Sequence, residues 1–371
     1  MHRLVSPTRA HRVILRLRRC TGSFVAGACF ALSLNISHAA STATMPETPA
    51  VASSALSNVP AARVLPAWQN GAARDALLAF VADVTREGSP DYVAPEARIA
   101  VFDNDGTLWS EAPLPFQIAF MIDQLKAHAS EHPEWADNPA FKALLAHDRA
   151  AMAQHKKALL DLLSAANSGM TTDEYDASIQ KWLANSRHPT LDRPYTELVY
   201  QPQLELLDYL RAHGFTIWIV SGGTSEFMRV WTERAYGIAP DHIVGTQEKL
   251  RYEVRDGRSV LVREPGFDFF DDGAGKPVGI FRAIGRRPIL AFGNSDGDRE
   301  MLEYTTSGPG KTLALLVHHD DGAREFAYDK DSEFARLDKA LDEAATRGWI
   351  VVSMKRDWKT IYPAQKADGT R

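Results

Sequence analysis

Residues 99–108 read Ile-Ala-Val-Phe-Asp-Asn-Asp-Gly-Thr-Leu, and this stretch decides the fold of the chain. Strands that are covered on both faces of a parallel sheet are near-continuous apolar runs, so residues 99–102 predict a buried strand. Ligands of such folds bind beyond the carboxyl ends of the strands. The stretch therefore predicts an α/β fold with Asp103 and Asp105 at its candidate site.

The spacing of these two carboxylates suits a two-part chemistry. One can attack as a nucleophile while the other transfers a proton. Because like charges repel at this distance, a divalent cation is an expected companion. The same Asp-Asn-Asp-Gly sequence is also good turn chemistry, so by itself the stretch leaves both interpretations open.

A second block ends another apolar run. Residues 215–220 predict a strand that leads into Ser221, Gly222 and Gly223, with a helix expected to follow. A hydroxyl and unobstructed backbone amides near a helix N-terminus suit phosphate oxygens. An ordinary glycine-rich turn between strand and helix is the alternative.

Two further blocks follow in order. Lys276 opens a short amphipathic segment, and a third apolar run at 288–292 leads into the acidic, glycine-rich loop 293–298. A lysine alone carries little information, and the loop could simply cap the helix after it. The four blocks are informative because they occur together, in this order and at these separations.

Together the four blocks resemble the haloacid dehalogenase superfamily, specifically its phosphoserine-phosphatase-like phosphatases. That family's pattern is hhhhDxDGT, hhh(S/T), a lysine, and hhhG(D/N)xxxD, where h is an apolar residue. The resemblance implies a Rossmann-like, doubly wound parallel sheet with a helical cap inserted between the first two motifs. The matching residues here are Asp103, Asp105, Ser221, Lys276, Asn294 and Asp298.

The resemblance also implies roles for these residues. Asp103 corresponds to the nucleophile, Asp105 to the general acid and base, and Ser221 with Lys276 to the clamp on the phosphoryl group. Substrate contacts are expected from Gly222, Gly223 and Glu111; helix capping and solvent exposure are the alternatives for Glu111. The implied Mg²⁺ site draws on Asp103, Asp105, Asn294 and Asp298.

The fourth motif departs from the commoner pattern. Asn294 stands where the family usually has an aspartate, and an amide oxygen can bind Mg²⁺ but brings no charge. Asp296 is an additional carboxylate, and Asp298 could orient Lys276 instead of binding the metal. The sequence leaves open which of the three ligates the ion.

Asp105 favours phosphoryl transfer over dehalogenation. Displacement of halide needs no general acid two residues after the nucleophile, and dehalogenases of the superfamily typically lack this aspartate. The ATPase branch of the superfamily has a different signature and needs several membrane spans, for which the chain offers no run of about 20 apolar residues.

The N-terminal region has the layout of a secretory signal peptide. Residues 1–19 hold six arginines and no acid, an apolar stretch follows, and small residues precede position 41. We therefore predict a signal peptide at 1–40, a linker at 41–62 and a periplasmic or secreted protein; a single-span anchor is the alternative. Cys20 and Cys29 both lie in the signal peptide, so a mature chain would have no thiol chemistry.

Charge limits the partners. Removal of the six arginines leaves 36 Lys and Arg against 47 Asp and Glu, a net charge of about −11. A binder of nucleic acid or of an anionic membrane needs a basic surface, so both are disfavoured. No obligate protein partner is evident, and a small phosphorylated substrate is expected.

Helical periodicity fills much of the insert between the first two motifs, where Thr171-Thr172-Asp173-Glu174 predicts a capping box. After the second motif, Asp256-Gly257 predicts a hairpin turn between strands at 250–254 and 259–262. We predict a helical cap at 111–196 and a catalytic core at 63–110 and 197–371; a helical subdomain without catalytic role is the alternative. Caps of this kind exclude water and select the leaving group. Residues 318–321, His-His-Asp-Asp, are expected to form a polar loop beside the site, with metal binding as the alternative.

The sequence thus predicts an exported, Mg²⁺-dependent phosphomonoesterase acting on small organic phosphates through an aspartyl-phosphate. A phosphotransferase or a pyrophosphatase on the same scaffold is the enzymatic alternative. A non-catalytic periplasmic protein that binds a phosphate ligand is the other. The identity of the phosphoester is not legible in the motifs.

Overall fold

The computed structural model describes residues 64–146, 148–332 and 334–365, all within the unit Ser57–Arg371. The predicted signal peptide and linker, residues 1–62, lie outside the described residues. Within the described ranges, no helix is both long enough and apolar enough to cross a bilayer.

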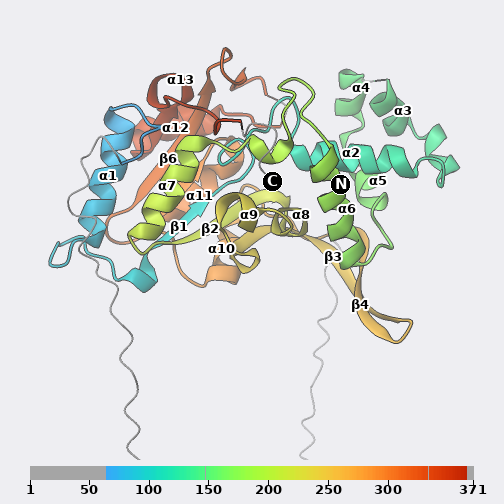
Figure 1. The fold of residues 1–371 in the computed structure, drawn as a ribbon, viewed down its shortest axis with the longest axis horizontal. Helices are drawn as coiled ribbons and strands as arrows, with labels where there is room; N and C mark the ends of the chain where they lie inside the picture. The colour runs from blue at the N-terminus through green and yellow to red at the C-terminus, as the bar shows by residue number, and fades with distance from the viewer. Residues whose placement is uncertain (1–63, 147, 333, 366–371) are drawn as a thin grey trace, which may run out of the picture. The chain divides into compact units, whose positions relative to one another are not determined.

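An eight-stranded sheet forms the centre of this unit (Figure 1). Its order is β4-β3-β2-β1-β5-β6-β7, and β8 also pairs with β6. The pairs β3–β2, β2–β1, β1–β5, β5–β6 and β6–β8 are parallel, whereas β4 and β7 add antiparallel strands. This order confirms the predicted α/β class. The strands are β1 Ile99–Phe102, β2 Thr216–Thr224, β3 Ile243–Arg255, β4 Arg258–Phe269, β5 Leu290–Gly293, β6 Leu313–Asp320, β7 Ala327–Tyr328 and β8 Ile350–Ser353.

Both faces of β1 are buried, as its unbroken apolar sequence requires. Ala100 and Phe102 belong to the core cluster that includes residues of α1 and α7, whereas Ile99 and Val101 belong to the cluster of α10, α11 and α12. Side chains alternate across a strand, so one short run serves two cores. The helices of these layers are α1 Ala72–Thr85, α7 Gln201–Ala212, α10 Gly275–Ile284, α11 Arg299–Thr306 and α12 Lys339–Arg347.

In the described residues of the predicted cap, 111–196, five α-helices precede α7. They are α2 Phe116–His128, α3 Pro139–Leu145, α4 Arg149–Gln154, α5 Lys156–Ala165 and α6 Thr172–Asn185. The expected capping box opens α6: the backbone N–H of Glu174 donates to Oγ1 of Thr171 (3.2 Å), and the N–H of Thr171 donates to Oε2 of Glu174 (2.7 Å).

Strands β3 and β4 form a long hairpin around the predicted Asp256-Gly257 turn. Both turn residues have positive φ (50° and 75°), and Arg255 pairs with Arg258 across them. The hairpin is longer than the sequence predicted, because β3 begins as a parallel partner of β2 before it pairs with β4.

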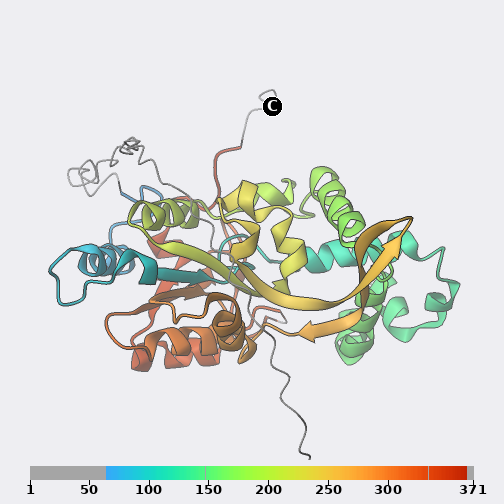
Figure 2. The same ribbon diagram turned by 90° about the horizontal axis from the view of Figure 1, so that it is seen from below.

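The hairpin also joins the core to the inserted helices (Figure 2). The N–H of Gly169 donates to the carbonyl of Arg263 (2.9 Å), and the N–H of Arg263 donates to the carbonyl of Met170 (2.9 Å). Backbone pairing therefore ties β4 to the segment just before α6.

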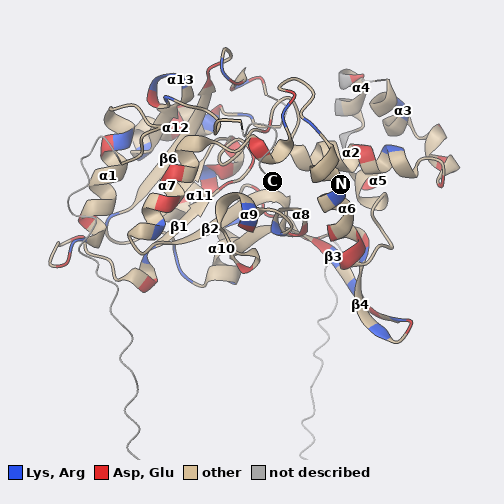
Figure 3. Cartoon of the chain, viewed as in Figure 1, with Lys and Arg blue, Asp and Glu red and all other residues tan. Residues whose placement is uncertain are grey.

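The remaining helices are short. They are α8 Ser225–Arg229, α9 Thr232–Tyr236, α13 Met354–Asp357 and the 3₁₀ turns η2 Pro95–Ala97, η3 Pro133–Asp137, η4 Tyr195–Glu197, η5 Pro240–His242 and η6 Asp296–Asp298. Across the described chain, basic and acidic residues are interspersed (Figure 3).

Candidate active site

The loop after β1 holds the first motif. The backbone N–H of Asp103 donates to the carbonyl of Phe292 in β5 (2.9 Å), and the Asp103 side chain is buried, with 6% of the residue exposed. Gly106 then takes φ = +72°, and its N–H donates to the carbonyl of Trp109 (2.8 Å). The stretch is therefore both a tight turn and the end of a strand that presents a carboxylate.

Lys276 at the start of α10 bridges two carboxylates. Its Nζ lies 2.8 Å from Oδ1 of Asp103 and 2.5 Å from Oδ1 of Asp298, and the lysine is only 2% exposed. Burial alone would lower the pKa of Lys276, but the carboxylates of Asp103 and Asp298 more than offset this and raise the pKa above its usual value. Lys276 is therefore a fixed cation beside the candidate nucleophile.

Asp298 positions this lysine, and both of its carboxylate oxygens accept hydrogen bonds. Its Oδ2 accepts the backbone N–H groups of Asn294 (2.9 Å) and Ser295 (3.0 Å), while Oδ1 faces Lys276. These contacts tie the loop after β5 to the lysine of α10. They favour the orienting role that the sequence left open for Asp298.

Asp105 lies beside the second motif. A Cβ built at Gly223 would lie 3.7 Å from Oδ2 of Asp105 and 3.6 Å from Oγ of Ser221. Burial raises the pKa of Asp105 to about 6, although the hydrogen bond from Nε1 of Trp109 (2.6 Å) and the charge of Lys276 act to lower it. A carboxyl with a pKa near 6 can give up and regain a proton at neutral pH.

The second motif is part of a strand and not of the loop expected after Val220. Strand β2 continues to Thr224, and its pairing with β3 shifts between Ser221 and Thr224, which indicates a bulge. A bulge redirects the strand locally. The N–H of Gly223 donates to Oγ of Ser221 (3.2 Å), and Ser221 is buried.

Gln117 fastens this bulge to helix α2. Its Nε2 donates to Oγ1 of Thr224 (2.7 Å), and its Oε1 accepts the N–H of Thr224 (2.8 Å). A Cβ at Gly223 would lie 3.1 Å from the same Oε1, so a side chain at this position would require Gln117 to shift. The first helix of the insert is thus bonded directly to the second motif.

Asn294 faces the first motif from the loop after β5. Oγ1 of Thr107 donates to Oδ1 of Asn294 (3.0 Å), and Nδ2 of Asn294 donates to Oε1 of Glu111 (2.6 Å). Because the Glu111 carboxylate can only accept, the NH₂ group of Asn294 faces Glu111 and its oxygen faces Thr107. A Cβ at Gly106 would overlap both Asn294 and Glu111, so this pair lies directly against the turn of the first motif.

Asp296 is committed elsewhere. Its Oδ1 accepts the N–H groups of Asp338 (3.1 Å) and Ala340 (2.9 Å) at the start of α12. A carboxylate suits the positive end of a helix, so Asp296 joins two segments of the core. Among Asn294, Asp296 and Asp298, Asn294 is the one whose side chain hydrogen-bonds a residue of the first motif, Thr107.

The charge balance around Asp103 fits a divalent cation. Burial, and next the negative charge of Asp298, raise the pKa of Asp103 to about 8, with Lys276 acting in the opposite direction. A nucleophile must be ionised, and an additional cation would favour that state. In the described residues no three His, Cys, Asp or Glu side chains form a ready cage. A site here would combine carboxylates with an amide or backbone oxygen, which are ligands that Mg²⁺ accepts.

The segment 318–321 contacts the first motif through His319. Nε2 of His319 lies 2.8 Å from the carbonyl of Gly106, and Nδ1 lies 3.2 Å from Oε2 of Glu325. The prediction of a loop is wrong for residues 318–320, because β6 runs to Asp320, and only Asp321 lies beyond the strand. The side chain of Asp320 accepts from the N–H of Lys355 (2.9 Å), so it contributes to packing near α13.

Several residues of the site carry no motif signal. Trp109 is described above. Gln117 was expected, with Glu111, to reach the substrate; instead its side chain bonds to Thr224. Asp272 lies beside the second motif, where a Cβ at Gly222 would approach its side chain to 3.6 Å. Burial raises the pKa of Asp272, and Lys276 partly offsets this. Its position four residues before the motif lysine is a sequence signal that could have marked it.

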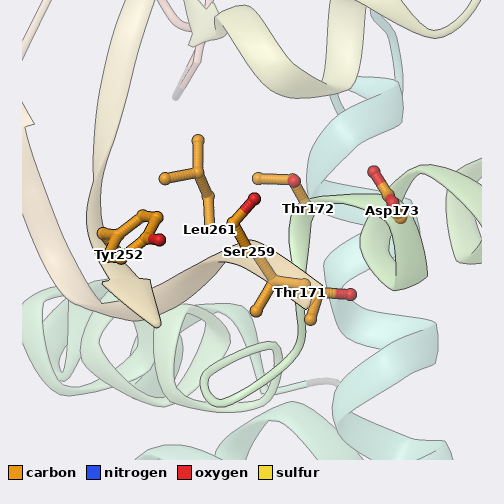
Figure 4. A pocket seen from close by; sticks show the side chains of 7 residues that line it. Thr171, Thr172, Asp173, Tyr252, Ser259 and Leu261 are labelled. Carbon is orange, nitrogen blue, oxygen red and sulfur yellow. The ribbon is translucent and has the colours of Figure 1, made fainter. Parts of the chain in front are cut away.

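A separate pocket of about 210 Å³ lies between the hairpin and the start of α6 (Figure 4). None of the motif residues lines it. Tyr252 and Leu261 of the hairpin face Thr171 and Thr172 across it. This pocket is therefore distinct from the cluster around Asp103.

Comparison with known families agrees with the motifs. Residues 100–303 match the family of haloacid dehalogenase-like hydrolases, which covers all four motifs. The chain belongs to this family, so the resemblance seen in the sequence is confirmed and the protein is classed as a hydrolase. No curated protein sequence matches the chain.

Solved structures give more distant similarities. A protein of unknown function from Bordetella pertussis Tohama I is 17% identical, with 69% of this chain and 97% of that chain covered at a TM-score of 0.44. A phosphoserine phosphohydrolase-like protein from Francisella tularensis subsp. tularensis SCHU S4 is 18% identical, covering 67% and 98% at a TM-score of 0.33. The cytosolic 5'-nucleotidase IIIB bound to cytidine is 14% identical, covering 76% and 85% at 0.37.

Proposed function

We propose that the protein is an exported, Mg²⁺-dependent phosphomonoesterase that hydrolyses small organic phosphates through an aspartyl-phosphate on Asp103. The observation that carries this proposal is the bridge from Lys276 to both Asp103 and Asp298, with Asp105 next to Ser221 and Gly223. A nucleophile, a proton donor and a fixed cation thus meet at the carboxyl ends of β1 and β2.

The reaction follows from these positions. A carboxylate oxygen of Asp103 attacks phosphorus, and the bond to the ester oxygen breaks. Asp105 gives its proton to the departing alkoxide and then takes a proton from water, which attacks the phosphoryl group and frees Asp103. Ser221 and Lys276 are placed to hold the phosphoryl oxygens as charge develops on them.

The metal is part of the proposal because of the charge at the site. Burial raises the pKa of Asp103, Asp105 and Glu111, and the charges of Asp105 and Asp103 raise the pKa of Glu111 further. An anionic substrate has to enter beside these carboxylates. Bound Mg²⁺ would neutralise part of this charge and polarise the phosphoryl oxygens. Asp103, the carbonyl of Asp105 and Asn294 are the groups we assign to it.

Export rests on the N-terminal sequence alone, with its basic, apolar and small-residue segments at 1–40. N-terminal sequencing of the native protein tests it: a mature chain starting near Ser41 is expected. An intact Met1 in a cytoplasmic fraction would refute the localisation.

Turnover of p-nitrophenyl phosphate by the purified protein tests the function, followed by a panel of natural phosphoesters. Hydrolysis that needs Mg²⁺ and stops in excess EDTA is expected. Full activity in EDTA would refute the proposed Mg²⁺ dependence. Phosphate binding without turnover would instead indicate a non-catalytic binding protein. Transfer to an acceptor alcohol, or preference for pyrophosphate, would favour the two enzymatic alternatives.

A further inference from the structure

Glu111 is an acidic side chain of the site that lies outside the four motifs. It follows the first motif, is 6% exposed and lies where its Oε1 accepts from Nδ2 of Asn294 (2.6 Å) and from the hydroxyl of Tyr328 (2.9 Å). The sequence placed Glu111 among the substrate contacts. In the structure, Glu111 instead accepts a hydrogen bond from Asn294, the residue that departs from the commoner form of the fourth motif.

The partners of Glu111 leave its charge uncompensated. In the described part of the chain, the hydrogen bonds to its carboxylate come from an amide and a phenol, both of them neutral. Asp298, by contrast, faces the ammonium group of Lys276. Burial, and then the charges of Asp105 and Asp103, raise the pKa of Glu111 well above its usual value. Glu111 therefore shares one electrostatic environment with both motif aspartates.

The backbone makes room for this arrangement. A Cβ at Gly106 would overlap Oε1 of Glu111 and Nδ2 of Asn294. Gly106 follows Asp105 directly, so Glu111 and Asn294 lie side by side against the turn that presents the motif aspartates. A carboxylate supplied from the β1 loop thus adjoins the position at which the β5 loop has only an amide.

We propose that Glu111 is a carboxylate of the cation site and supplies the negative charge that Asn294 lacks. This inference rests on the Mg²⁺ dependence in the proposed function. In this site the carboxylate comes from the loop after β1, and the loop after β5 contributes the neighbouring amide of Asn294. Carboxylates are the preferred charged ligands of Mg²⁺, so this arrangement keeps the charge of the site.

A charge exchange tests this proposal without substrate. Binding of Mn²⁺, as a paramagnetic substitute for Mg²⁺, is measured by electron paramagnetic resonance on the full mature protein and on Glu111→Gln, Asn294→Asp and the double variant. We expect Glu111→Gln to weaken binding about 10–100-fold. Asn294→Asp should tighten binding, and the double variant should return towards wild type.

Two controls separate this from general effects. Glu300→Gln removes a partly exposed carboxylate of α11 outside the proposed cation site, and its Mn²⁺ affinity should stay close to wild type. Circular dichroism and thermal unfolding show whether each variant is folded. The double variant keeps the test decisive if Glu111→Gln alone folds poorly, because it restores the number of carboxylates.

Three results would overturn the inference: unchanged Mn²⁺ affinity in folded Glu111→Gln, a double variant no better than Glu111→Gln, or no binding of Mn²⁺ or Mg²⁺ by wild type. The failure of the proposed function is distinguishable. A protein that binds Mn²⁺ through Glu111 and hydrolyses no phosphoester supports this inference and refutes the phosphatase. A protein that hydrolyses phosphoesters but binds no Mn²⁺ or Mg²⁺ refutes this inference and leaves a metal-independent phosphatase.

Discussion

The two sides of Asp103 treat negative charge differently. On one side, Lys276 lies 2.8 Å from Asp103 and 2.5 Å from Asp298, so a cation of the chain itself joins the carboxylates. On the other side, Glu111 has only Asn294 and Tyr328 as hydrogen-bond donors in the described structure. The negative charges of Asp103 and Asp298 are thus paired with a lysine of the protein itself. The negative charge of Glu111 has no such cationic partner among its hydrogen-bond donors in the described structure.

This difference indicates which parts of the chemistry the protein performs unaided. Burial of charges without a partner is costly, and proteins normally pair them or leave them protonated. The pKa values of about 8 for Asp103 and about 6 for Asp105 express that cost. We propose that Lys276 positions the phosphoryl group and that the divalent cation binds on the side of Glu111.

Loss of the nucleophile should have the largest effect. Asp103→Asn removes the carboxylate that forms the covalent intermediate, so turnover should fall by roughly 10⁴-fold or more. Steady-state hydrolysis of p-nitrophenyl phosphate measures this. Acid-quenched wild type should also carry phosphate that the variant does not; near-normal turnover by Asp103→Asn would end the covalent mechanism.

Loss of the proton donor should cost less and depend on the substrate. Asp105→Asn should slow hydrolysis of alkyl phosphates by about 10²–10⁴-fold, because the alkoxide then leaves without a proton. The defect should shrink with p-nitrophenyl phosphate, whose leaving group needs none. Equal defects with both substrates would contradict the assignment of Asp105 as general acid.

The metal-free protein should lose stability as pH rises. The folded pKa values of Asp103 and Asp105 lie above the unfolded values near 4, so from about pH 4 to 8 the folded state binds more protons than the unfolded state. The free energy of unfolding then falls with pH, by at most about 1.4 kcal/mol per pH unit for each group.

Thermal unfolding in EDTA between about pH 4.5 and about pH 8, a range that includes both pKa values, checks this. Asp103→Asn should flatten the pH dependence, and Mg²⁺ should raise the melting temperature more at the alkaline end. A slope that neither Mg²⁺ nor Asp103→Asn changes would show that these carboxylates do not carry the excess charge.

The smallest effect should come from a site remote in function. Gly257 in the hairpin turn has φ = +75° and no neighbouring atoms within 4 Å of a built Cβ, so Gly257→Ala meets backbone strain alone. Denaturant unfolding should show a loss of about 1 kcal/mol, with kcat unchanged. A large loss of activity would mean that the hairpin contributes to catalysis through the inserted helices.

The order of the motifs and the fold class could be predicted from the sequence because both depend on local patterns. An apolar run that ends in Asp103 predicts a strand buried on two faces, and the structure confirms it. The Asp256-Gly257 turn and the capping box at Thr171 are likewise fixed by neighbouring residues. Such features need no knowledge of distant contacts.

The partners of each carboxylate could not be predicted in this way. Asp296 and Asp298 are two residues apart and have similar local sequence, yet one bonds to the start of α12 and the other to Lys276. The strand limits of β2 also depended on its register with β3, which shifts after Ser221.

By itself, the sequence determined the α/β class, the order of the four motifs and the family, because these follow from residue types at fixed spacing. Only the tertiary structure decided that Glu111 meets Asn294 and that His319 lies against Gly106. These pairs are separated by more than 180 positions, and their contacts depend on how β1, β5 and β6 align. Sheet order and register, set by packing on both faces, bring such residues together.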